Sequence, residues 1–111
     1  MSAQMLSLFL QAVALVESGN DPRAVGAIGE RGRFQMAPVV AASCGGHGER
    51  EAARWEKHLE RELVAMGVEP LPFNVALAWN AGMTKVRAGK VPVSSYRYAG
   101  RVVATMESLR Q

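Results

Sequence analysis

The stretch that decides the fold is ALVESGNDPRAVGAIGERGRFQMAP, residues 14–38. It begins as the end of an apolar segment, with Glu17 two residues before Gly19, and continues into a loop rich in glycine and arginine. Glycine readily adopts the left-handed conformation that closes a helix, so we expect a first helix to end at Gly19. That helix delivers one carboxylate to the edge of a loop whose glycines allow the backbone to approach a ligand closely.

Hydrophobic periodicity predicts a mostly helical protein. Over residues 3–18, Leu6, Leu10, Val13 and Glu17 fall within one narrow arc at about 100° per residue, which puts Glu17 on the apolar face. Two short strands could form a β-hairpin in the loop that follows. The pattern also predicts a short helix from Pro38 to near Cys44, and then helices over residues 49–66, 73–80, 83–88 and 95–109.

The two longest of these later helices each have a predicted inward face. For residues 49–66 it consists of Ala52, Trp55, Leu59, Leu63 and Met66. For residues 95–109 it consists of Tyr98, Val102, Met106 and Leu109.

Length and composition indicate one globular domain over residues 1–111. The chain is 49% hydrophobic and 21% charged, which excludes a disordered tail, and it is too short for two cores. Cys44 is the only cysteine, so no internal disulfide can form. The apolar N-terminal segment has no Lys or Arg before Arg23, so no signal peptide is visible, and it is too short and interrupted to span a membrane.

Positive charge is concentrated in the last third of the chain. The formal net charge is +3, and residues 83–111 contain six cations and a single anion, Glu107. This imbalance fits a polyanionic partner such as nucleic acid, an anionic lipid surface or an anionic cell-wall polymer. It also fits a C-terminal helix whose cations serve only to keep it solvated.

Glu17 is the strongest candidate for a catalytic group. Burial on an apolar face disfavours a charged carboxylate, and so does the negative end of the helix dipole. Both effects favour a glutamic acid that keeps its proton near neutral pH, as a general acid requires. An ordinary solvated glutamate at a frayed helix end is the alternative.

Other residues suggest a carbohydrate ligand. Gln35 supplies a neutral donor and acceptor in the glycine-rich loop, and Trp79 with Asn80 places an aromatic face beside an amide at a helix end. Such a pair can hold a sugar ring and its N-acetyl group. Each feature is also compatible with a core residue or a helix cap.

Taken in order, these segments resemble the soluble lytic transglycosylases, the goose-type lysozyme-like family that cleaves peptidoglycan. The family's first signature is Glu-Ser, a turn with Pro, an Ala, a Gly and then Gly-x-x-Gln-x-x-Pro; it is matched by Glu17, Ser18, Pro22, Ala24, Gly29, Gly32, Gln35 and Pro38. ALAWNAG, residues 76–82, is similar to its Ala-Tyr-Asn-Ala-Gly signature, and SYRYAGRV, residues 95–102, to its closing Tyr-Val-x-x-Val segment. Gly26 departs from the pattern because a serine is usual there.

The resemblance implies a lysozyme-like helical fold and cleavage of the β-1,4 bond between N-acetylmuramic acid and N-acetylglucosamine. Glu17 would protonate the leaving oxygen and then take the proton of the muramic acid 6-hydroxyl, which closes a 1,6-anhydro ring. The substrate-binding residues implied are Ser18, Phe34, Gln35, Trp79, Asn80 and Tyr98. Ser18 would steady the backbone or Glu17; Gln35, Asn80 and Tyr98 would hold sugar or orient Glu17; Phe34 and Trp79 would line the cleft.

Only one catalytic carboxylate is needed on this route, and we expect Asp21 and Glu30 to be surface charges. If either reached across the cleft to activate water, the protein would be a hydrolase of the lysozyme kind, with free reducing ends as products. The other alternative is a non-catalytic module of the same fold that binds cell wall or nucleic acid.

We expect peptidoglycan glycan strands as the partner, no nucleic acid, no membrane span, no metal and no organic cofactor. We also expect a monomer that acts in the cell wall or periplasm or in association with a phage.

Overall fold

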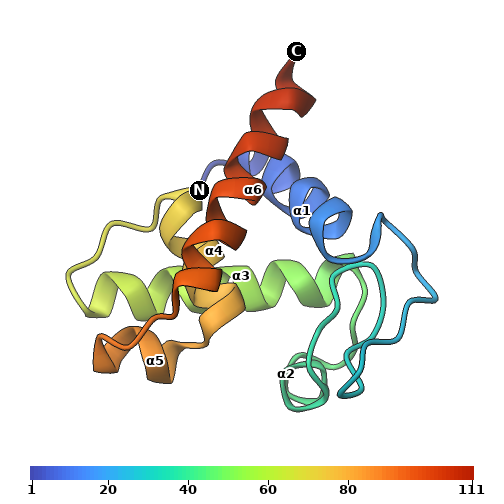
Figure 1. Ribbon diagram of the computed structural model, residues 1–111, viewed down its shortest axis with the longest axis horizontal. Coiled ribbons are helices and arrows are strands. Elements are labelled where there is room, and N and C mark those ends of the chain that lie inside the picture. Colours follow the sequence, from blue (N-terminus) through green and yellow to red (C-terminus); the bar gives the residue numbers. More distant parts are fainter.

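The computed structural model describes all residues, 1–111, as six helices joined by turns and one long loop (Figure 1). The helices are α1 (Ala3–Ser18), α2 (Pro38–Cys44), α3 (Glu49–Ala65), α4 (Pro72–Ala81), α5 (Met83–Ala88) and α6 (Val93–Arg110). Each predicted helix is present, with ends within about two residues of those expected, a normal uncertainty for helix boundaries. The mostly α fold class is confirmed.

The first helix begins and ends as its sequence predicts. Ser2 caps its start, because the Ser2 Oγ accepts a hydrogen bond from the Met5 N–H at 3.1 Å. Gly19 closes it in the left-handed conformation, with φ of 65°, and its N–H donates to the Leu15 carbonyl. The last turn of α1 therefore holds Glu17 at a defined place.

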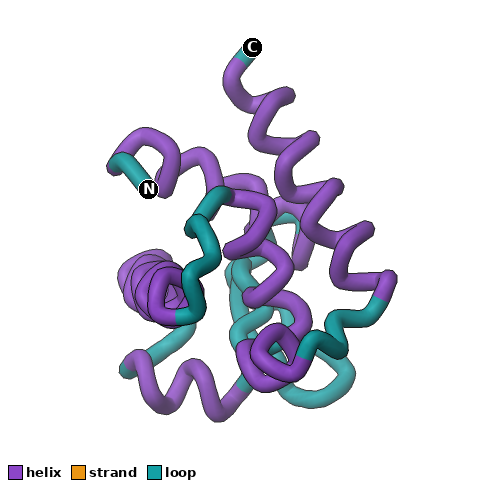
Figure 2. The backbone as a smooth tube through the Cα atoms, turned by 90° about the vertical axis from the view of Figure 1, so that its left-hand side faces the viewer, coloured by secondary structure: helices purple, strands orange, loops and turns teal.

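Helix α6 packs against both α1 and α4 and crosses in front of the other helices, while α3 lies behind them (Figures 1 and 2). The core between them contains 18 hydrophobic residues, mostly Ala, Val, Leu and Met, with Phe9, Phe34 and Tyr98 as its aromatic members. No helix is both long enough and apolar enough to cross a membrane.

The loop over residues 19–37 contains no strand. Its antiparallel pairing is limited to two isolated bridges, between Val25 and Arg31 and between Arg31 and Met36. The β-hairpin considered from the sequence is therefore reduced to these bridges. The loop instead follows a series of turns with glycines at positive φ, including Gly29 and Gly32 with φ of 90° and 82°, in place of regular strand pairing.

Two of the predicted inward positions are wrong. Met66 and Leu109 are 38% and 36% exposed, because each lies at or beyond the end of its helix, past the elements that would cover it. On α3 the inward face instead includes Glu56, which is fully buried.

Glu56 is a buried carboxyl group whose two oxygens make no hydrogen bond in the structure. Burial, together with the carboxylate of Glu60 one turn further along α3, raises the pKa of Glu56 to about 8 and outweighs the opposing charges of the Met1 ammonium and Lys57. The group is therefore neutral below that pH in the folded protein but ionised above about pH 4.5 once the chain unfolds. The contribution of the protonated Glu56 carboxyl to the free energy of unfolding therefore falls as the pH rises toward 8.

We predict that Glu56→Met stabilises the protein more at pH 8 than at pH 5. Methionine has a similar volume and leaves no unpaired polar group in the core. Thermal unfolding followed by circular dichroism should show a rise in Tm of several degrees at pH 8, since about 1 kcal/mol shifts Tm by roughly 4–8 °C in a domain of this size. Glu49→Gln, on an exposed turn of the same helix, is the control. Equal effects of Glu56→Met at both pH values would contradict the buried-proton account.

Candidate active site

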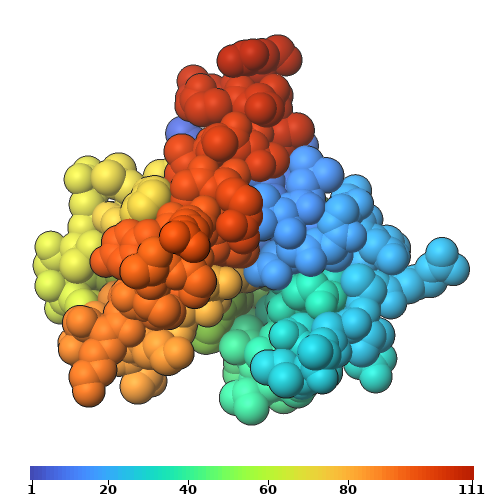
Figure 3. All heavy atoms as spheres, viewed as in Figure 1, coloured from blue at the N-terminus to red at the C-terminus, as the bar shows by residue number.

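One cavity of about 330 Å³ lies between the loop of residues 19–37 and helices α1, α2, α3 and α4. In the space-filling view an indentation separates the loop and α2, in cyan to green, from the orange C-terminal segments (Figure 3). Glu17, Glu30, Gln35 and Asn80 supply its polar lining. The rest is mainly apolar, with Trp55 and Trp79 as its aromatic members.

Glu17 is fixed at the polar end by a hydrogen bond across the fold. The Tyr98 hydroxyl of α6 donates to Glu17 Oε2 at 2.9 Å, and Tyr98 is only 3% exposed. Burial and the neighbouring Glu17 charge raise the pKa of Tyr98, so the tyrosine keeps its proton and remains a donor. This leaves Oε1 as the oxygen of Glu17 that is free to carry a proton.

The surroundings favour a protonated Glu17. Burial raises the pKa of Glu17 above its ordinary value of about 4.5, and the charge of Glu30 raises it further. The Tyr98 hydrogen bond and the Arg101 cation act in the opposite direction, but burial has the largest effect. The direction of the shift agrees with what the apolar helix face suggested.

Asn80 is also held by α6, through a residue that sequence analysis did not single out. The Ser95 hydroxyl donates to Asn80 Oδ1 at 2.7 Å, and Ser95 is buried. The Asn80 Nδ2 group then has its donors free for a ligand in the cavity. Because Ser95 lies three residues before Tyr98, the two hydroxyls project from the same face of α6. That spacing is the feature of the sequence from which the role of Ser95 could have been predicted.

Ser18 and Gln35 shape the loop through backbone contacts. The Ser18 Oγ donates to the Arg33 carbonyl at 2.7 Å and accepts from the Asp21 N–H at 3.0 Å, so it ties the loop to the end of α1. The Gln35 Nε2 donates to the carbonyls of Ala24 and Gly32 at 3.1 and 2.9 Å. Only the Gln35 Oε1 remains available in the cavity; Ser18 does not line it.

Phe34 does not line the cavity, contrary to the role implied by the resemblance. It is 1% exposed and belongs to the hydrophobic core. The left-handed conformation of the next residue, Gln35, with φ of 47°, turns the Gln35 side chain toward the cavity while Phe34 packs inward. The guanidinium of Arg33 covers the outer face of the Phe34 ring at 4.9 Å.

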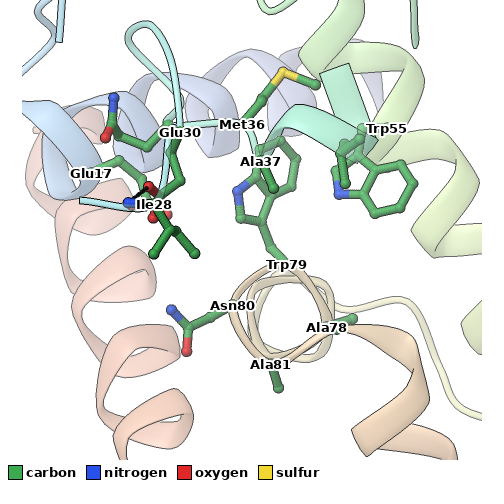
Figure 4. Close-up of a pocket in the computed structure, with 13 residues that line it drawn as sticks. Glu17, Ile28, Glu30, Met36, Ala37, Trp55, Ala78, Trp79, Asn80 and Ala81 are labelled. Carbon is green, nitrogen blue, oxygen red and sulfur yellow. Dashed lines mark hydrogen bonds between the residues drawn. The ribbon is translucent and has the colours of Figure 1, made fainter. Parts of the chain in front are cut away.

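Glu30 is not the surface charge that we expected. It is half-buried and lines the same cavity as Glu17, with its Oε1 accepting a hydrogen bond from the Ile28 N–H at 3.0 Å (Figure 4). A Cβ atom on Gly26 would lie 2.5 Å from that oxygen, so glycine at position 26 makes room for the carboxylate. Asp21, by contrast, is exposed and outside the cavity.

The opposite end of the cavity is apolar and aromatic. Trp79 lies between the polar end and Trp55, which comes from α3 (Figure 4). Trp79 is supported from behind by an edge-to-face contact with Phe9, with ring centroids 6.0 Å apart. Trp55 stacks on His58 at 5.0 Å, and it was predicted only as a packing residue.

No group of three or more His, Cys, Asp or Glu side chains is arranged to bind a metal ion. The cavity offers carboxyl, amide and aromatic groups instead, which suit acid–base chemistry on a neutral, hydroxyl-rich ligand.

In comparison with known proteins, no protein-family model, no curated protein and no solved structure matches this chain.

We predict that Glu17 titrates above 4.5 and that Tyr98→Phe raises its pKa further, because the lost hydrogen bond stabilises the charged form. NMR of ¹³C-labelled glutamate carboxyl groups across pH measures both values. Phenylalanine keeps the ring that fills the core, so the fold should persist. A midpoint at or below 4.5 in the parent, or a lower midpoint in Tyr98→Phe, would contradict this assignment.

Proposed function

We propose that this protein is a peptidoglycan lytic transglycosylase with a lysozyme-like fold, in which Glu17 is the single general acid and base. The observation that carries the proposal is the half-buried Glu17 carboxyl, held by Tyr98 in a cavity that also contains Trp79 and Asn80. The substrate bond is the β-1,4 linkage between N-acetylmuramic acid and N-acetylglucosamine.

The meeting of three distant segments supports this proposal. Glu17, Asn80 and Tyr98 belong to the three segments that resemble the family's signatures, and the first and last are 81 positions apart. Glu17 and Asn80 line one cavity, and Tyr98 bonds directly to Glu17. Nothing in the sequence order alone requires them to meet.

In the proposed reaction the Glu17 carboxyl acts twice, first as an acid and then as a base. Glu17 protonates the oxygen that leaves C1 of muramic acid as the glycosidic bond breaks. The resulting carboxylate then takes the proton of the 6-hydroxyl as that oxygen bonds to C1 and closes the 1,6-anhydro ring. The 6-hydroxyl is held in the site with the rest of the sugar, which favours it over water as nucleophile.

Hydrolysis is the second candidate, because a second carboxyl group, that of Glu30, lines the same cavity as Glu17. An inverting hydrolase places a second carboxylate about 6.5–9.5 Å from the acid, on the opposite face of the sugar. Glu30 is close enough to raise the pKa of Glu17, but both carboxyl groups are at the same end of the cavity (Figure 4). Glu30 is therefore better placed to help Glu17 keep its proton than to act as a base from the opposite side of the cleft.

The basic C-terminal third suits an anionic wall polymer as partner. Lys85, Lys90 and Arg97 are exposed, and residues 70–106 contain no acidic residue. Such a surface attracts polyanions at a distance and would raise the local concentration of the enzyme on the wall. The proposed place of action is the cell wall or periplasm, or a phage particle that must penetrate it.

We predict that Glu17→Gln lowers wall cleavage by about 10²-fold or more, since general acid catalysis contributes typically 10²–10⁴-fold. The amide keeps the shape of the side chain but donates no acidic proton. Turbidity of purified cell walls measures the rate, and circular dichroism checks that the fold persists. A variant that keeps more than about a tenth of the parent rate would rule out Glu17 as the acid.

We also predict that the released muropeptides carry 1,6-anhydromuramic ends and that Glu30→Gln keeps most of the activity at mildly acidic pH. Mass spectrometry separates these ends from free reducing ends, which are heavier by one water. Asp21→Asn is the matched control, because Asp21 lies outside the cavity. Reducing ends, together with loss of cleavage in Glu30→Gln but not in Asp21→Asn, would identify a hydrolase with Glu30 as base.

A further inference from the structure

A second cavity lies between the C-terminal end of α3, helix α4, helix α5 and the start of α6. It has a volume of about 240 Å³, its lining contains no charged residue, and it shares no residue with the cavity that holds Glu17. Figure 2 is viewed from the side of the molecule on which α3 ends. We call this cavity the α5 groove and define it by the apolar residues of its lining that matter below, Met66, Leu77, Val86, Val91 and Tyr96.

The α5 groove leaves large apolar side chains in contact with solvent. Met66 is 38% exposed and Tyr96 is 50% exposed, although both line the groove. Leu71 and Val93 are exposed as well, and each lies within three residues of a lining residue. Apolar side chains that gather in this way, rather than being scattered singly, mark a surface that binds a partner or a membrane.

Cations that take part in no ion pair lie beside the groove. Lys85, Lys90 and Arg97 each directly neighbour a lining residue in the sequence, and all three are exposed. None of them lies within 4.0 Å of a carboxylate. Of the two acids nearby, Glu62 is already paired with an arginine of α5 at 3.1 Å, which leaves Glu69. The border of the groove is therefore positively charged.

Apolar side chains beside unpaired cations match the boundary of an anionic lipid layer. Lysine and arginine keep their charged ends at the headgroup phosphates, while aliphatic and tyrosine side chains reach the acyl chains. A wall polymer or a nucleic acid also attracts the cations, but it covers no apolar surface. A peptide confined to the groove would leave Leu71 and Val93 exposed, whereas a lipid layer extends over the groove and its border.

We infer that the α5 groove and its neighbouring cations form a docking surface for a membrane that contains anionic phospholipid. The inference does not rest on the proposed function, because the groove and the cavity around Glu17 have no residue in common. Docked in this way, the protein would lie on the membrane surface, and the Glu17 cavity would stay free of lipid contacts.

The test is sedimentation of the full chain with lipid vesicles. One set consists of phosphatidylcholine alone, and the other contains about a quarter phosphatidylglycerol, at about 0.1 M salt so that weak charge attraction is screened. The measured quantity is the partition coefficient between vesicles and solution. The parent should sediment with the anionic vesicles and not with phosphatidylcholine alone.

The apolar contribution is tested by Met66→Gln and Tyr96→Gln, which keep the charge of the chain. Each should lower partitioning several-fold, and the two together by about 10-fold or more, because interfacial binding increases with the apolar area that enters the lipid. Leu109→Gln is the matched control, since Leu109 is 36% exposed at the other end of α6 and does not line the groove. If Tyr96→Gln does not fold, Met66→Gln against Leu109→Gln still decides.

The charge contribution is tested by Lys90→Gln and Arg97→Gln. Each should lower partitioning by about 5-fold, as expected for one basic side chain held at an anionic surface. Arg23→Gln is the control for net charge, because Arg23 is exposed on the loop of residues 19–37, away from the groove, and its loss should have a smaller effect. Circular dichroism checks that every variant is folded.

Three results would overturn the inference. The first is the absence of binding to anionic vesicles, which would leave a protein partner for the groove. The second is equal binding to both kinds of vesicle. The third is binding that the charge variants weaken but Met66→Gln and Tyr96→Gln do not, which is a general attraction to polyanions. The two proposals fail separately: a parent that cleaves walls without docking removes the docking surface alone, and a parent that docks without cleaving walls removes the transglycosylase alone.

Discussion

The hydrogen bond from Tyr98 to Glu17 is the contact on which the site depends. It joins residues 81 positions apart, at the end of α1 and on the buried face of α6, and it spans 2.9 Å. Because Tyr98 is buried, its hydroxyl has few alternative partners, and Glu17 is drawn to the boundary between core and cavity. A carboxyl group at that boundary loses water without losing access to a ligand. These are the conditions under which burial raises a carboxyl pKa and the group can still act as an acid.

Helix α6 serves as a support for the cavity rather than as one of its walls. From one face it holds Glu17 through Tyr98 and Asn80 through Ser95, so the acid and the amide are fixed by the same rigid element. The loop is held separately, by Ser18 and by the Nε2 group of Gln35. Functional groups supported in this way by a second set of hydrogen bonds keep their orientation, which catalysis by positioned groups requires. Ser18 and Ser95 are therefore positioning residues, which act through the loop and through Asn80.

The helices and the apolar placement of Glu17 could be predicted from local sequence. The positions of several other side chains could not, because they depend on tertiary packing or on an irregular loop. Helix periods and ends depend on nearby residues, so α1 with its Gly19 terminus followed from pattern alone, as did the apolar placement of Glu17. The inward position of Glu56 contradicts the rule that charged residues face solvent. The rule fails here because the Glu56 carboxyl keeps its proton in the folded protein and is therefore uncharged. Phe34 and Glu30 lie in an irregular loop without a period, where left-handed residues such as Gln35 decide which side chains face the cavity. Trp55 faces the cavity because of how α3 packs against α2, which is a tertiary effect.

The pH dependence of wall cleavage is the most direct test of the proposal that Glu17 acts as a protonated acid. We expect the rate to be highest where Glu17 is protonated and to fall with rising pH through a midpoint above 4.5. The measurement is the initial rate of turbidity loss of purified walls from pH 4 to pH 9, within the range in which the protein stays folded. The ionic strength is kept constant at about 0.1 M, because salt at that concentration screens the charges of the basic surface. A rate that instead increases as the carboxyl ionises, with its midpoint near the ordinary glutamate value, would contradict the account.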